Sequence, residues 1–101
     1  MSLLEEAVPV PRSRVVPSLE PVRDRVGYAA VFAEHRASVL GLAFVLCGDR
    51  HVAEDVAAEA FARVWPHWRA GRVADDRSYL RKAVVNEVRS RWRRRAVERR
   101  E

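Results

Sequence analysis

The chain has 101 residues, of which 33% are charged and 49% hydrophobic, so it holds one domain at most, since a typical domain has roughly 100–150 residues. Cys47 is its only cysteine, which excludes an internal disulfide and argues against a cysteine-built zinc site. No apolar run approaches the roughly 18 residues that a membrane helix needs, and the N-terminus has no signal-peptide core. We therefore expect a cytoplasmic protein without membrane contacts of its own.

Positive charge is concentrated toward the C-terminus. The net charge is +5, but residues 1–60 carry 6 basic and 9 acidic side chains, whereas residues 61–101 carry 13 and 5. All the basic residues except Lys82 are arginines, whose planar guanidinium can donate two hydrogen bonds to one phosphate. The clustering of positive charge near the C-terminus is more informative than the choice of arginine over lysine. It favours a polyanionic partner at that end of the chain.

Residues 1–26 hold four of the five prolines and show no sustained helical or strand period. Proline removes a backbone donor and moves the residue before it out of the helical region. This stretch is predicted to be a flexible, disordered leader, with local structure only around Leu3 and Leu4.

The first predicted helix covers about residues 28–46. Its apolar positions recur at spacings of 3, 4 and 7, which gives one stripe for a core; they are Phe32, Val39, Leu40, Ala43, Leu46 and Cys47. Gly48 is expected to stop this helix, and Asp49 to cap the next one.

The second predicted helix begins near Arg50 and is expected to end or kink at Pro66. Residues 67–77 are predicted to form a loop, after which Asp75, Asp76 or Ser78 can cap a third helix that runs from about residue 79 into the arginine-rich tail. The expected fold class is all-α, a compact bundle of three or four helices with short connections.

The third predicted helix has two unlike faces. Its apolar residues centre on one side, and the opposite side is a narrow stripe of three cations around one amide. The apolar set is Leu80, Val84, Val85, Val88 and Trp92, and the stripe is Lys82, Asn86, Arg89 and Arg93. Such a stripe would bind phosphates with a strong salt dependence, and an asparagine among cations can discriminate bases. A solvated helix end is the alternative.

The second helix carries three carboxylates, Glu54, Asp55 and Glu59. Asp55 and Glu59 lie one turn apart, but no further ligands or pocket accompany them, so neither a metal site nor a cofactor is expected. An acidic face that docks on a basic partner, or simple solvation, fits better.

Aromatic residues cluster after Phe61. Their positions favour a core role for Trp65 and Trp92, whereas Trp68 and Tyr79, at the edges of the predicted loop, are better candidates for exposure and base stacking. No catalytic motif is present, and the chain is not expected to be an enzyme.

Several of these segments together resemble region 2 of bacterial sigma factors, in particular the extracytoplasmic-function class (group IV of the sigma-70 family). They are Gly48-Asp49-Arg50, Ala53-Glu54-Asp55-Val56, Glu59-Ala60-Phe61 and Trp65, and then Tyr79-Leu80-Arg81-Lys82-Ala83-Val84-Val85-Asn86, Trp92 and the arginine run. The resemblance spans about residues 31–95.

The resemblance implies that the second helix docks on a coiled coil of the RNA polymerase β′ subunit. Asp55 and Glu59 match the family's acidic contact positions, and Trp65 a nearby apolar one. Ala58 stands where the family usually has glutamine, and a lost hydrogen bond of about 1 kcal/mol predicts weaker docking.

It also implies that the loop before the third helix receives a base flipped out of the promoter −10 non-template strand, with Asn86 lining the pocket. The expected DNA-binding residues are Arg72, Asp76, Ser78, Tyr79, Lys82, Asn86, Arg89 and Arg93. Pro66 and residues 70–74 depart from the family's usual loop, so the base preference does not transfer.

The expected function is therefore to dock on polymerase and to recognise and melt the −10 element. The expected organisation is a leader (1–26), a region 2 domain (27–97) and a charged tail end (98–101). There is no room for the family's −35-reading region 4, so an excised domain or fragment is expected. Two alternatives stay open: a general helical nucleic-acid-binding regulator, and a domain whose main partner is an anti-sigma factor.

Overall fold

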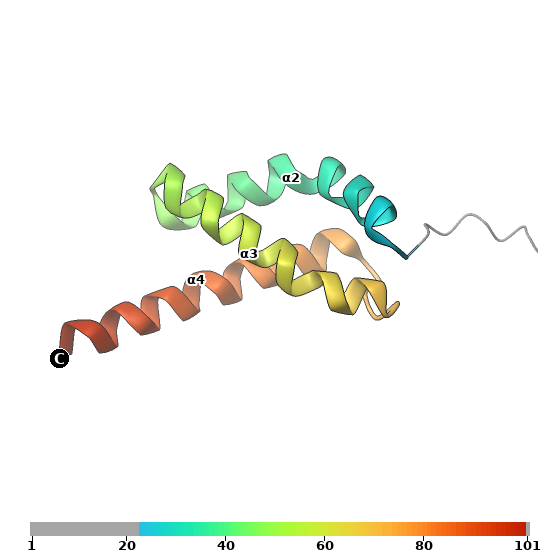
Figure 1. Cartoon of the computed structure of the whole chain (residues 1–101). Coiled ribbons are helices and arrows are strands. Elements are labelled where there is room, and N and C mark those ends of the chain that lie inside the picture. Colours follow the sequence, from blue (N-terminus) through green and yellow to red (C-terminus); the bar gives the residue numbers. More distant parts are fainter. Residues whose placement is uncertain (1–22, 101) are drawn as a thin grey trace, which may run out of the picture.

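The computed structural model describes residues 23–100, which form three α-helices and no strand (Figure 1). The helices are α2 (Arg25–Cys47), α3 (Arg50–Arg69) and α4 (Asp76–Arg100). All three pack against one another, which confirms the all-α prediction. Most of the predicted leader, with Leu3 and Leu4, lies outside the described residues.

Helix α2 begins three residues earlier than the apolar pattern predicts. The Asp24 carboxylate accepts a hydrogen bond from the Gly27 amide at 2.9 Å, a side-chain cap that satisfies one of the free donors of the first turn. At the other end Gly48 adopts φ 72°, a left-handed conformation that glycine reaches without strain, and its N–H donates to the Phe44 carbonyl. The predicted stop at Gly48 is confirmed.

Helix α3 begins as predicted but continues past Pro66. Asp49 caps its start by accepting from the Val52 amide at 3.1 Å. Proline has no N–H to give, yet its carbonyl accepts from Ala70 at 3.1 Å, so the helix keeps one more turn after it. The expectation that Pro66 ends the helix is therefore wrong, and the connecting loop is correspondingly shorter.

The core lies where the three helices meet and is built mainly of alanine and valine. Trp68, Leu80, Val56, Val64 and Val84 are fully buried. The remaining buried apolar side chains are Val31, Val39, Ala43, Ala53, Ala57, Ala60, Phe61, Val73 and Val88. The small side chains allow the helices to approach one another closely. Trp68 is the largest of the fully buried side chains.

Three aromatic expectations are wrong. Phe32, placed on the core stripe of the first predicted helix, is 40% exposed, and Val31 is buried in its stead. Trp68, predicted to be exposed, is fully buried, and Trp92, predicted to be core, is 51% exposed. The end of α4 extends beyond α2 and α3 (Figure 1), and Trp92 lies at the margin of the core, where it lines a hollow with Cys47 and Val52. Trp65 is half-buried, stacked at the margin of the core near Trp68.

By length and composition alone, α2 could cross a membrane. The sequence pattern did not predict a helix of this kind, because Glu34 and Arg36 interrupt the apolar run. Its stripe of Val31, Val39 and Ala43 packs into the helical core. The rest of its apolar surface faces outward.

Candidate nucleic-acid interface

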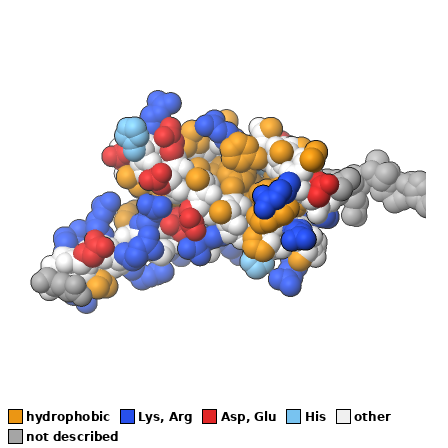
Figure 2. Space-filling model, viewed as in Figure 1, with side chains coloured by type: hydrophobic (Ala, Val, Ile, Leu, Met, Phe, Trp, Pro, Cys, Tyr) orange, Lys and Arg blue, Asp and Glu red, His pale blue; other side chains and the backbone are white. Residues whose placement is uncertain are grey.

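The stripe on α4 faces solvent as predicted. Lys82, Asn86, Arg89 and Arg93 are all exposed, and Lys and Arg side chains gather over this helix in Figure 2. Within residues 23–100, no carboxylate lies within ion-pair distance of the three cations of this stripe. The amide therefore lies among cations that are available to phosphates.

The start of α4 is fixed by a local cap. Asp75 precedes the helix; its carboxylate accepts from the Ser78 hydroxyl at 2.9 Å and its carbonyl from the Tyr79 amide at 3.0 Å. The Ser78 hydrogen bond lowers the pKa of the Asp75 carboxyl, so the cap stays charged at neutral pH. The sequence offered three capping candidates, and the structure selects Asp75.

The loop between α3 and α4 is anchored at both ends. Gly71 takes φ 76° and its amide donates to the Trp68 carbonyl, while Val73 is buried in the core. Arg72 and Ser78 are exposed, and Asp76 and Tyr79 are half-buried. The tyrosine ring lies 5.9 Å from that of His67, so part of its surface is covered.

The acidic residues of α3 differ in their surroundings. Asp55 is exposed and has no ion pair within residues 23–100. Glu59 is half-buried and pairs with Arg63 at 3.1 Å. Asp55 is therefore more available to a partner than Glu59, because Glu59 is already paired with Arg63 of the same helix.

A buried carboxylate that the sequence reasoning missed joins α3 to α4. Glu87 is only 3% exposed; Arg63 lies 3.3 Å from its Oε1 and Arg91 donates to its Oε2 at 3.1 Å. Arg94 approaches Oε2 to 4.0 Å. A buried charge is tolerated only with such partners. Its position between Val84 and Val88, one turn before Arg91, was the signal that could have located it.

The structure therefore places the predicted residues on two surfaces rather than in one pocket. The cationic stripe and the loop lie on and before α4, and the acidic pair lies on α3. Arg63 links the two surfaces, because it pairs with Glu59 on its own helix and with Glu87 on α4. The orientation of α4 is thus tied to the acidic face of α3 by charge as well as by packing.

An aromatic cluster joins the start of α2 to the end of α3, and its role is structural. The Tyr28 hydroxyl donates to the Phe61 carbonyl at 2.7 Å, and its ring lies within about 5 Å of both Trp65 and Trp68. Burial raises the pKa of Tyr28 to about 12, with the charge of Asp76 as a second cause. Guanidinium groups of Arg23 and Arg25 lie over the two indoles. These rings hold the helices together and leave Trp65 only partly available.

The family model described as Sigma-70 region 2 matches residues 31–98 of the chain. These residues include α2 from Val31 onward, the whole of α3 and the loop, and all but the end of α4. No curated protein and no solved structure matches the chain.

Proposed function

The chain belongs to the sigma-70 region 2 family, a domain of the sigma factors that serve in promoter recognition, and from this premise we propose how its two surfaces divide the work. RNA polymerase and promoter DNA are the partners that membership implies, and both are found in the cytoplasm. We propose that α3 docks on the β′ coiled coil, and that α4 with the loop before it binds and opens the −10 element.

The observation that carries the proposal is the separation of opposite charges on adjacent helices. A stripe that combines three unpaired cations with Asn86 suits a DNA strand, because cations position the phosphates and the amide can distinguish base edges. The exposed Asp55 with Glu59 one turn away suits a basic protein surface. A general duplex-binding module would leave this acidic face without a role.

The finer assignment is to the extracytoplasmic-function class. It rests on the segment from Gly48 to Trp65 and on the block from Tyr79 to Asn86. In the structure, the first segment runs from the C-cap of α2 through most of α3 and holds both core and exposed positions, and the second lies in the first half of α4. An anti-sigma factor that covers the acidic face follows from the same assignment and is part of the proposal.

Binding to the isolated β′ coiled coil tests the docking surface. Asp55→Arg and Glu59→Arg are expected to weaken this binding at least tenfold through like-charge contacts with the basic partner, and Asp55→Arg to have the larger effect because Glu59 is already paired. Glu34→Arg is the matched control, since it makes the same charge change on an exposed site of α2. Unchanged β′ affinity in both α3 variants would refute the docking assignment.

Binding to labelled single-stranded and duplex −10 DNA, at two salt concentrations, tests the α4 surface. Arg89→Ala is expected to weaken binding to every sequence and to reduce the salt slope by about 0.7 for a single strand. Asn86→Ala is expected to change the base preference as well. An equal loss for all sequences in both variants would exclude base reading by Asn86, and salt-steep binding to duplex without β′ binding would favour a general nucleic-acid regulator.

A further inference from the structure

A continuous groove runs between α2 and α3 on the side of α3 that faces away from α4. It consists of three hollows of about 370, 150 and 440 Å³. The first two share Arg36 and Leu40 in their walls, and the last two share Phe32 and Phe61. We call this the α2–α3 groove.

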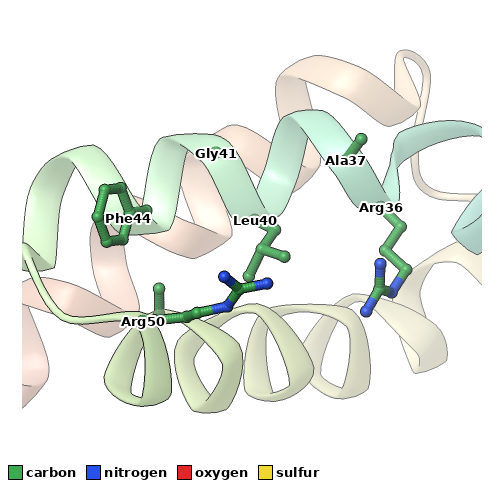
Figure 3. A pocket seen from close by; sticks show the side chains of 7 residues that line it. Arg36, Ala37, Leu40, Gly41, Phe44 and Arg50 are labelled. Atoms are coloured by element: carbon green, nitrogen blue, oxygen red, sulfur yellow. The ribbon is translucent and has the colours of Figure 1, made fainter.

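The walls of the α2–α3 groove are apolar with a positive rim. Phe44 is 49% exposed and Phe32 40% exposed, although both are large hydrophobic side chains. The charged residues in the walls are Arg25, Arg36 and Arg50 against the single carboxylate of Glu54. Figure 3 shows Leu40 projecting from α2 toward α3, with the guanidinium groups of Arg36 and Arg50 in the same gap and Phe44 on α2 beside it. A suitable occupant is therefore apolar and acidic.

Such a stretch occurs in the chain itself. Residues 2–8 combine four apolar side chains, Leu3, Leu4, Ala7 and Val8, with the carboxylates of Glu5 and Glu6, and they contain no basic residue. This chemistry complements the α2–α3 groove in both polarity and charge.

The intervening chain is long enough to place this segment there. Residues 9–22 precede the described part, and 14 proline-containing residues span up to about 43 Å in an extended conformation. The described chain begins at Arg23, whose guanidinium lies over Trp68 near the Trp65 end of the groove. From Trp65 to Arg50, α3 rises about 22 Å, so the whole groove is within reach.

We propose that the α2–α3 groove is the docking site of residues 2–8 of the same chain, with the leucines against Leu40 and Phe44 and the two glutamates beside Arg36 and Arg50. Tethering by a short linker gives an effective concentration in the mM range, so weak individual contacts suffice to fill the groove. Docking covers the apolar surface of α2 that the three-helix core leaves open.

A spin label at position 2 of the full chain tests the proposal. In Ser2→Cys/Cys47→Ser, a nitroxide on the new cysteine is expected to broaden the amide signals of Leu40, Gly41 and Phe44 and to leave Val97, near the end of α4, unaffected. Glu5→Arg/Glu6→Arg should abolish this broadening. Adding Arg36→Glu/Arg50→Glu should restore it, and because both arginines are exposed this change leaves the core intact.

Broadening that is absent, that spreads evenly over α4, or that survives the reversal of Glu5 and Glu6 would overturn the proposal. Mixing an isotope-labelled chain without nitroxide with an unlabelled spin-labelled chain separates the second-copy case, because broadening in that mixture would mean docking between molecules and would also overturn it.

A second consequence rests on the proposed function. Ala58 lines the groove one residue before Glu59, so a docked segment borders the surface assigned to β′. Removal of residues 2–8 is then expected to raise β′ affinity severalfold. The spin-label result does not depend on this, so failure of β′ docking and failure of leader docking can be distinguished.

Discussion

The two sides of α3 are closed in different ways. Toward α4, the valines interlock and the buried Glu87 joins Arg63 to Arg91 across the helix pair. Toward α2, the contact surface is apolar but opens into a groove in which Phe32 and Phe44 stay partly exposed. The α4 side is therefore committed to the fold, because its apolar groups are buried and the Glu87 carboxylate is paired with arginines of both helices. The α2 side keeps apolar surface that a further chain segment can cover.

Matched truncations on the two sides should differ most. Leu80→Ala removes a fully buried side chain on α4 and is expected to lower the free energy of unfolding by about 3 kcal/mol. Phe44→Ala removes a larger side chain on α2 that is half exposed, and should cost only about 1 kcal/mol. Urea unfolding of both variants measures the difference; equal losses would mean that the α2 side is as tightly packed as the α4 side.

Trp68 and Trp92, whose burial was predicted wrongly, show which features of the fold the sequence alone does not predict. Capping residues and apolar spacing predict the three helices and the buried stripe of α4, because these are local properties. The burial of Trp68 follows from its spacing of four after Val64, but only if the helix continues past Pro66. If Pro66 is taken as the end of the helix, Trp68 is assigned to the loop that follows.

Trp92 failed for a different reason. It lies on the apolar side of its own helix, yet helical periodicity does not contain the lengths of the neighbouring helices, and α4 outruns them. The site residues divide in the same way. Exposure of Lys82, Asn86, Arg89 and Arg93 was predictable from the helical period, whereas the pairing of Arg63 with Glu87 depends on how α3 packs against α4.

Alkaline pH should act on the α2 side through Tyr28. Its pKa is about 12 in the folded chain and 10.0 for an unperturbed tyrosine, so the unfolded state loses this proton first. The corresponding stability is fully present below about pH 10 and is lost as the pH rises to about 12, by about 1–2 kcal/mol after allowance for the partly exposed hydroxyl. Tyr28→Phe should remove this loss, although it also removes the hydrogen bond to Phe61 at neutral pH. Urea unfolding at pH 8 and at pH 11 measures the loss of stability in the wild-type chain and in Tyr28→Phe. An identical loss in the two would contradict the assignment to Tyr28.

Neutralising one carboxylate on each side compares the two kinds of ion pair. Glu87→Gln keeps the side-chain shape but replaces charge-assisted hydrogen bonds with neutral ones, and is expected to cost about 1 kcal/mol at both low and high salt because the site is buried. Glu54→Gln breaks the exposed pair with Arg50 and should cost about 0.3–0.5 kcal/mol, with the effect falling at high salt. If the cost of Glu87→Gln also disappears at high salt, the carboxylate is solvated and does not lock α3 to α4.

The smallest expected effect concerns the exposed edge that separates the two sides. Ala58→Gln restores the side chain that the family usually carries there, and one added hydrogen bond of about 1 kcal/mol or less should raise affinity for the β′ coiled coil by up to about fivefold. Ala62→Gln is the matched control, because Ala62 is also exposed and lies one turn further along the same helix. An equal gain from both substitutions would indicate a general effect of a longer polar side chain. A gain at position 58 alone would place the contact beside Asp55 and Glu59, on the face of α3 that we propose for docking on β′.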